Sequence, residues 1–195
     1  MKRIWNKLCR IYRQNFWSLE KRARRAGVKL GTDNFIASEF WGTEGYLITI
    51  GNHCGITAGV KMFTHGGSRV ARDKYPKFDI FGKVNIGNNV YLGTNSLVMP
   101  GVTIGDNVLV AAGSVVTKSV PSGYVVGGNP ARIISTTDEY IKRNQRYNLN
   151  SKGMNAKEKM KLLTSVTEDM FIKKGEMRPP VGGGNSGLKN IRLAA

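Results

Sequence analysis

The sequence is short of the residue types that metal centres and disulfide frameworks need. Its 195 residues include two cysteines, Cys9 and Cys54, and two histidines, His53 and His65. Two cysteines give no disulfide framework, which suits a reducing compartment. Two histidines without a Cys/His cluster do not supply the three or four ligands of a zinc site. We therefore expect no metal site.

Long apolar runs are also missing. No stretch approaches the roughly 18 apolar residues that a membrane-spanning helix needs. The N-terminus is basic but lacks the uninterrupted apolar segment of a signal peptide. These absences predict a cytoplasmic protein.

Acidic residues are scarce, with 13 Asp and Glu against 30 Lys and Arg and a net charge of +17. The excess lies at the ends: residues 1–29 carry +9 and residues 136–195 carry +6, whereas residues 30–135 carry only +2. A nucleic-acid-binding domain concentrates positive charge on its folded surface. The nearly neutral middle therefore argues against a nucleic-acid partner, although a non-catalytic protein with basic ends that bind lipid or nucleic acid remains an alternative.

What the sequence does have is a period of six residues across 80–120. Aliphatic residues recur every sixth position, and a second small or aliphatic column precedes them by two. Gly or Asn follows three positions after the first column, and these residues enter the left-handed backbone region at least cost. The three columns are Ile80, Ile86, Leu92, Val98, Ile104, Val110 and Val116; Val84, Val90, Ser96, Val102, Val108, Ser114 and Val120; and Asn89, Asn95, Gly101, Asn107 and Gly113.

A short fixed period of this kind predicts a parallel β-solenoid, in which each repeat buries its apolar face against its neighbours. Cys54 falls in the inward column between Ile48 and Val60, so we expect it to be a small core residue. The pattern resembles the hexapeptide-repeat acyltransferases. That resemblance implies a left-handed parallel β-helix of three hexads per turn, in the class of all-β solenoids, assembled as a homotrimer.

Segments outside the period predict α-helical extensions. Residues 1–27 form a basic helix with apolar residues three and four apart, residues 28–135 form the solenoid, residues 136–174 contain helices over about 136–147 and 156–174, and residues 175–195 are a flexible tail. Two interpretations of the N-terminal helix stay open. It covers the exposed end of the solenoid, or it contacts an anionic membrane surface through basic and aromatic residues.

Residues 66–79 interrupt the period with a long polar loop, and such loops are often functional. His65 is the last residue before the loop. Both His53 and His65 fall in the turn column by count, but only His65 adjoins the loop. By resemblance, His65 matches the Thr-His of maltose and galactoside O-acetyltransferases, which implies a general base for acyl transfer.

The resemblance also implies a donor site for acetyl-CoA, carried by the terminal coils and the segment Asn129-Pro130-Ala131-Arg132. Lys118 and Arg132 are two cations in a nearly neutral core, and they suit phosphate groups. The residues that match the donor site are Thr94, Ala112, Thr117, Lys118 and Arg132.

The acceptor side is implied by Glu44 and Asp79. Glu44 matches an acidic residue near the sugar site, where it orients His65 from a neighbouring subunit or binds a sugar hydroxyl; Asp79 alternatively forms an ion pair within the loop. The chain looks most like the surface-polysaccharide acetyltransferases, which implies acetylation of a sugar hydroxyl on a capsule, O-antigen or exopolysaccharide precursor at the inner membrane face. An amino sugar or an antibiotic is the alternative acceptor.

Overall fold

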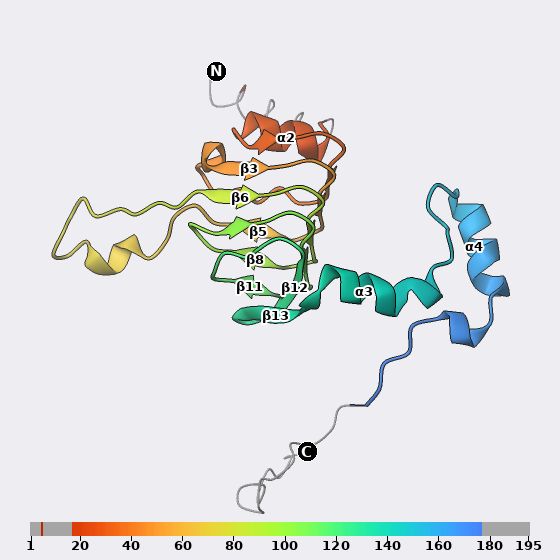
Figure 1. Ribbon diagram of the computed structural model, residues 1–195. Helices are drawn as coiled ribbons and strands as arrows, with labels where there is room; N and C mark the ends of the chain where they lie inside the picture. The colour runs from red at the N-terminus through yellow and green to blue at the C-terminus, as the bar shows by residue number, and fades with distance from the viewer. Residues whose placement is uncertain (1–4, 6–16, 177–195) are drawn as a thin grey trace, which may run out of the picture. The chain divides into compact units, whose positions relative to one another are not determined.

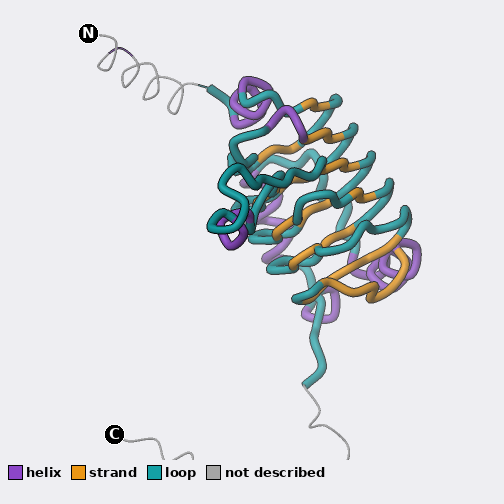
Figure 2. The backbone as a smooth tube through the Cα atoms, turned by 90° about the vertical axis from the view of Figure 1, so that its left-hand side faces the viewer, coloured by secondary structure: helices purple, strands orange, loops and turns teal. Residues whose placement is uncertain are grey.

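The computed structural model describes residues 5 and 17–176, which form two compact units divided between Arg143 and Asn144. The first unit is built around short parallel strands that coil about a common core (Figures 1 and 2). From residue 48 to residue 116, successive strands belong to three different sheets in turn, so each strand from residue 84 to residue 116 pairs with the strand three before it. This is the arrangement of a three-sided parallel solenoid.

Each sheet stacks one strand from each coil. The first sheet contains β1 (Lys29–Leu30), β3 (Ile48–Ile50), β6 (Val84–Ile86) and β9 (Thr103–Ile104). The second contains β2 (Phe35–Ile36), β4 (Gly55–Ile56), β7 (Tyr91–Leu92), β10 (Leu109–Val110), β12 (Tyr124–Gly128) and β13 (Ala131–Thr136). The third contains β5 (Lys61–Met62), β8 (Leu97–Val98) and β11 (Val115–Val116).

The pairing register confirms a repeat of three hexads. Tyr91 pairs with Leu109, eighteen residues later, and Leu97 pairs with Val115 at the same spacing. Gly55 pairs with Tyr91 across thirty-six residues, because the loop predicted over 66–79 lies within this interval. The loop contains the 3₁₀ helix η2 (Ser68–Ala71) and projects from the coil (Figures 1 and 2).

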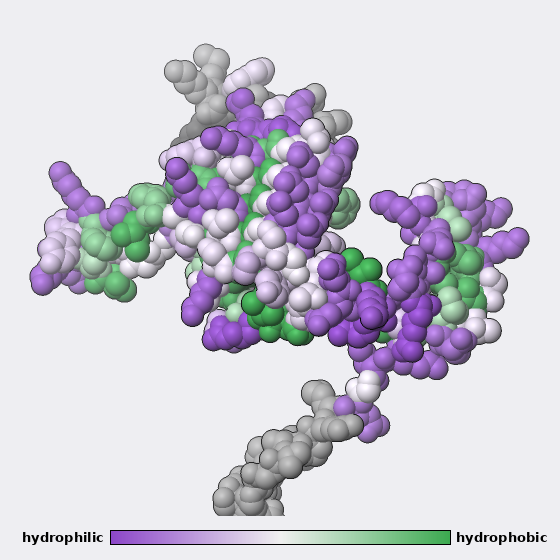
Figure 3. All heavy atoms as spheres, in the orientation of Figure 1, coloured by the Kyte–Doolittle hydropathy of each residue, from purple (hydrophilic) through white to green (hydrophobic). Residues whose placement is uncertain are grey.

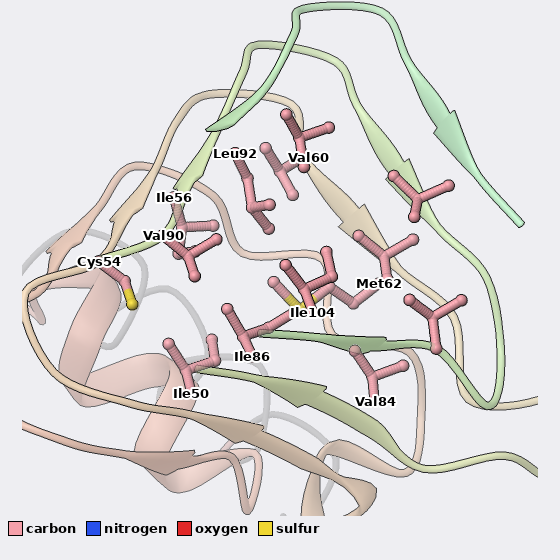
Figure 4. Packing of buried hydrophobic residues seen from close by; sticks show 14 of the residues in the cluster. Ile50, Cys54, Ile56, Val60, Met62, Val84, Ile86, Val90, Leu92 and Ile104 are labelled. Carbon is pink, nitrogen blue, oxygen red and sulfur yellow. The ribbon is translucent and has the colours of Figure 1, made fainter. Parts of the chain in front are cut away.

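The inward columns form the core that their periodicity predicts. From Val84 and Ile86 onward, every member of both columns is buried, including the serines Ser96 and Ser114. Figure 4 shows hydrophobic side chains of these columns, among them Ile86, Val90 and Leu92, converging inside the coil. Cys54 is 2% exposed, as expected for a core residue. Ile80 is the exception: it is half exposed because residues 79–81 still belong to the loop, so the first column begins at Ile86.

The predicted turn positions have the required backbone. Asn89, Asn95, Gly101, Asn107 and Gly113 all have positive φ, and so does His53 at 57°. The same prediction is wrong for His65, which does not have positive φ. His65 instead forms an antiparallel bridge with Phe81. The chain leaves the coil at His65, so the left-handed turn that ends the other repeats is not formed there.

Helix α2 (Leu19–Arg25) adjoins the first coil. Its Arg24 donates to the carbonyl oxygens of Leu30 and Gly31 at 2.8 and 2.9 Å, in agreement with a helix that covers the solenoid end. The helix does not run unbroken through residues 1–26, because Ser18 has extended backbone angles and its hydroxyl caps the helix at Lys21 N. Residues 1–4 and 6–16 lie outside the described part.

The coil ends in a hairpin. β12 adds to β10 in parallel, and β13 returns beside β12 in antiparallel register after the cis Asn129–Pro130 peptide. Helix α3 (Thr137–Asn144) follows directly. Thr136 and Glu139 cap it reciprocally through side-chain to backbone hydrogen bonds of 2.9 and 3.1 Å.

The second unit contains η3 (Gln145–Tyr147), α4 (Ala156–Ser165) and η4 (Glu168–Met170). Asn155 and Glu158 form a capping box at the start of α4. The expected helix over 156–174 is too long, because Val166 is extended and the Thr167 hydroxyl contacts Asp169. No helix among residues 5 and 17–176 has the length and apolar character needed to cross a membrane.

Candidate active site

His65 lies at the point where the third sheet gives way to the loop. Its side chain is 41% exposed, and its Nδ1 lies 2.7 Å from Oε2 of Glu44. Both residues belong to the same chain, so the contact does not need a neighbouring subunit, contrary to one of the two roles considered for Glu44. Glu44 precedes η1 (Gly45–Leu47), and β3 follows directly.

Two threonines hold the Glu44 carboxylate. The hydroxyl of Thr43 donates to Oε1 at 2.5 Å, and the hydroxyl of Thr64 donates to Oε2 at 2.8 Å. Thr64 is fully buried, directly beside His65. The hydrogen bonds from Thr43 and Thr64, followed by that of His65, lower the pKa of Glu44 to about 2, so the carboxylate is ionised at neutral pH.

This geometry fixes the proton on the imidazole ring. An ionised carboxylate only accepts hydrogen bonds, so the neutral ring carries its proton on Nδ1 and leaves a lone pair on Nε2. A histidine held in this tautomer by a carboxylate is suited to remove a proton from a hydroxyl group.

A cavity of about 360 Å³ lies beside His65. Its walls are largely aromatic, with Phe40, Trp41 and Phe63 among the lining residues, and Glu39 and Thr64 supply polar groups. Glu39 forms an ion pair with Arg22 of α2. The cavity therefore joins a base to an apolar surface, which is the usual composition of a small-molecule site.

Asp79, the other acidic residue expected at the acceptor site, contacts its own loop. It accepts a hydrogen bond of 2.8 Å from the Ser68 hydroxyl, and Arg72 lies 3.7 Å away. The structure thus agrees with the alternative considered for Asp79, an ion pair within the loop. Asp79 is not among the residues that line the cavity beside His65.

A second cavity, of about 400 Å³, contains Lys118 and Arg132. Valine, proline and isoleucine side chains of the last coil and the hairpin form most of its wall. Within the described part of the chain, neither cation has a carboxylate partner; Arg132 only contacts the carbonyl oxygen of Ala131. Two unpaired cations in an apolar hollow fit an anionic group such as phosphate.

His65 and Lys118 share one corner of the solenoid. His65 follows β5 and Lys118 follows β11, the outer strands of the three-stranded third sheet, which lie about 10 Å apart at the usual strand spacing. Thr117 belongs to this corner as well. Thr94 and Ala112 lie at a different corner, after the second sheet, where Gly113 N donates to Thr94 O at 2.8 Å. One chain therefore divides the expected donor-site residues between two corners.

The remaining candidates contribute no further site. Cys54 donates to the carbonyl oxygen of Gly87 at 3.1 Å, and burial raises the pKa of its thiol. His53 lies in a turn 3.7 Å from Asp33. Among the described residues no cluster of His, Cys, Asp and Glu is able to hold a metal ion.

Sequence reasoning missed Thr43, Thr64 and the aromatic wall. Thr64 falls two positions after an inward residue, where the period predicts only a turn, so its burial had no separate signal. Phe40 and Phe63 come together because Phe40 pairs with Lys61 across coils.

Comparisons with known proteins identify the family of the chain. Residues 83–118 match the family described as bacterial transferase hexapeptide (six repeats). Protein CapG of Staphylococcus aureus is 46% identical over 160 residues, which cover 78% of this chain and 91% of that protein. Galactoside O-acetyltransferase of Escherichia coli (strain K12) is 37% identical over 92 residues, 47% of this chain and 45% of that enzyme.

Among solved structures, a maltose O-acetyltransferase from Clostridium difficile 630 matches with a TM-score of 0.50 and 32% identity, over 56% of this chain and 59% of that one. The fold and site thus define an acyltransferase built on a β-solenoid. The chain belongs to the hexapeptide-repeat acyltransferases. It spans about half the length of the galactoside enzyme.

Proposed function

We propose that the protein transfers an acetyl group from acetyl-CoA to a hydroxyl group of a carbohydrate. The observation that carries this proposal is the Glu44–His65 pair, with a contact of 2.7 Å, at the edge of a largely aromatic cavity. The names of two similar proteins, a galactoside and a maltose O-acetyltransferase, support a sugar as acceptor.

In the proposed reaction, Nε2 of His65 removes the proton from the acceptor hydroxyl. The hydroxyl oxygen attacks the thioester carbonyl carbon, a C–O bond forms, and the C–S bond breaks. The proton held on His65 passes to the departing CoA thiolate, which leaves as the thiol. Glu44 stabilises the imidazolium formed between these steps, because its carboxylate faces Nδ1.

For the donor, Lys118 and Arg132 are proposed to bind the phosphate groups, and Thr117 lies on the same corner. Thr94 and Ala112 complete this site only if they come from a second chain, because they lie at the other corner. A closed trimer of left-handed solenoids, with a site between each pair of chains, satisfies this requirement and agrees with family membership.

The proposed acceptor is a sugar of a surface-polysaccharide precursor, acetylated in the cytoplasm. The basic helix α2 supports a peripheral position at an anionic membrane surface through Arg25, because Arg22 and Arg24 in the same last turn already pair with Glu39 and Glu20. One side of α2 packs against the first coil, so only the other side is free to face a membrane.

Steady-state acetyl transfer to a panel of sugars tests the proposal with three variants. We expect His65→Ala to lower kcat by about 10²- to 10⁴-fold, since it removes the base. Glu44→Gln keeps the side-chain shape, but its amide is able to donate to Nδ1 and favour the wrong tautomer. We expect a loss of at least about tenfold in kcat, with the KM for acetyl-CoA unchanged.

His53→Ala is the matched control, because His53 lies in a turn outside both cavities. It should retain the wild-type rate. An unchanged rate of acetyl transfer in His65→Ala would show that His65 is not the general base.

A further inference from the structure

We propose that Phe63 is a stacking platform for the acceptor, and that it binds the C–H face of an uncharged hexopyranose ring beside His65. This inference rests on the proposed carbohydrate acetyltransferase function and adds the part of the acceptor that the site recognises.

Phe63 and Phe40 form one wall of the cavity that His65 also lines. Their ring centroids lie 5.4 Å apart at an interplanar angle of 59°. Phe40 is 43% exposed and Phe63 is half-buried. The Phe81 ring also lies near His65, with its centroid 5.7 Å from that of the imidazole. Aromatic rings thus surround the base and line the cavity beside it.

The wall is held by the solenoid itself. Phe63 N donates to the carbonyl oxygen of Val98 at 2.9 Å, which extends the pairing of β5 with β8 by one residue. Phe63 lies only two residues before His65. Phe40 pairs in parallel with Lys61, and the ammonium group of Lys61 lies over the Phe40 ring at 5.6 Å. Lys61 thus occupies one face of Phe40, and it is Phe63 that we assign to the ligand.

A hexopyranose matches this arrangement. One face of a sugar ring presents C–H groups, and the face of an aromatic ring is electron-rich, so the two attract and exclude water. The hydroxyl groups at the edge of the sugar then point away from the aromatic ring, where a base is able to reach one of them. Trp41, which is 4% exposed, adds a third aromatic side chain to the lining of this cavity.

The charges around the cavity favour an uncharged sugar. No lysine or arginine is among the residues that line it, and its one formally charged lining residue is Glu39. The ionised Glu44 lies directly behind His65. A sugar carboxylate in this cavity would meet the Glu44 charge, and the two cations near the cavity already have partners, because Arg22 pairs with Glu39 and Lys61 lies over the Phe40 ring.

The test measures acetylation of methyl glucoside and methyl galactoside, and of their 6-carboxylates and 6-carboxamides, by the wild-type protein, Phe63→Leu and Phe63→Trp. Leucine keeps an apolar side chain but removes the aromatic face. We expect Phe63→Leu to raise the KM for the neutral glycoside roughly tenfold with little change in kcat. Phe63→Trp should restore binding. The 6-carboxylates should be used at least about tenfold less efficiently than the matching 6-carboxamides, which also lack the 6-hydroxyl but carry no charge.

Calorimetric titration with acetyl-CoA and light scattering accompany each variant. An unchanged KM in Phe63→Leu, equal use of the 6-carboxylates and 6-carboxamides, or acetylation of neither glycoside by a wild-type protein that binds acetyl-CoA would overturn the proposal. So would dissociation of the assembly by Phe63→Leu, because Phe63 would then be a subunit contact. A different result would contradict the proposed function itself: a His65→Ala variant that still transfers acetyl groups at the wild-type rate.

Discussion

At the residue scale, two buried serines in one inward column differ in what their hydroxyls contact. Ser114 donates to the carbonyl oxygen of Ala111 at 2.7 Å and accepts from Gly128 N at 3.2 Å. The hydroxyl of Ser96 has no hydrogen-bond partner within the described part of the chain. Both side chains are fully buried, so the two positions differ in hydrogen bonding and not in exposure.

We therefore expect opposite results from the same substitution. Ser114→Ala should lower the free energy of unfolding by about 1 kcal/mol, because it leaves Gly128 N without its acceptor. Ser96→Ala removes an unpaired polar group and should be neutral or stabilising. Urea unfolding of the two variants measures this, and an equal loss in both would contradict the assignment.

The candidate active-site residues also show how much of a site one sequence predicts. The position of His65 at the start of the loop was predictable, because the period of six ends at this residue and a polar loop begins. Glu44 was expected near the acceptor, but its contact with His65 joins residues 21 apart in one chain. The role of Thr64 was not predictable, since its hydroxyl meets Glu44 only after an irregular first turn folds against the third sheet.

At the element scale, the strand positions agree closely with the sequence prediction, because every coil needs the same residue types at the same positions. An inward aliphatic residue and a turn residue with positive φ recur every six positions, and both residue types can be identified from the sequence. The helix ends were less predictable. They depend on single capping side chains such as Ser18 and Asn155, which compete with a longer apolar pattern.

The bounds of the loop over 66–79 were also only partly predictable from the sequence. Its length and polarity predicted a departure from the coil, but the departure includes Ile80, which the hydrophobic pattern assigns to the core. Exposed hydrophobic side chains, among them Val70, Ile80 and Phe81, belong to this segment, and Figure 3 shows hydrophobic side chains on the projecting loop. A periodic residue is buried only when backbone pairing places it inside the coil.

Helix α2 provides a prediction about the first coil. Arg24→Ala removes two hydrogen bonds to the carbonyl oxygens of Leu30 and Gly31 and the ion pair with Glu20. Because the site is partly exposed, we expect a loss of about 1 kcal/mol in the free energy of unfolding.

Arg25→Ala is the control on the same helix, since Arg25 makes no hydrogen bond or ion pair within the described residues. It should change stability by less than about 0.5 kcal/mol. Thermal unfolding compares the two, and equal shifts would show that α2 does not depend on Arg24 for its attachment.

At the scale of the whole molecule, the solenoid places the candidate site residues at two of its corners. One corner brings His65 and Lys118 to a common edge, two strands apart, and the next corner carries Thr94 and Ala112. A donor that contacts both sets must lie between two chains. The folded unit therefore provides two halves of a site, and the proposed trimer joins them without any change within the chain.

The most direct measurement for this account is calorimetric titration of the full chain with acetyl-CoA and with desulfo-CoA in moderate salt. We predict saturable binding of one molecule per chain, abolished in Lys118→Ala/Arg132→Ala and retained in the charge-matched control Arg25→Ala/Lys29→Ala. Absence of binding by the wild-type protein, or equal binding by the Lys118→Ala/Arg132→Ala variant, would contradict the proposed donor site.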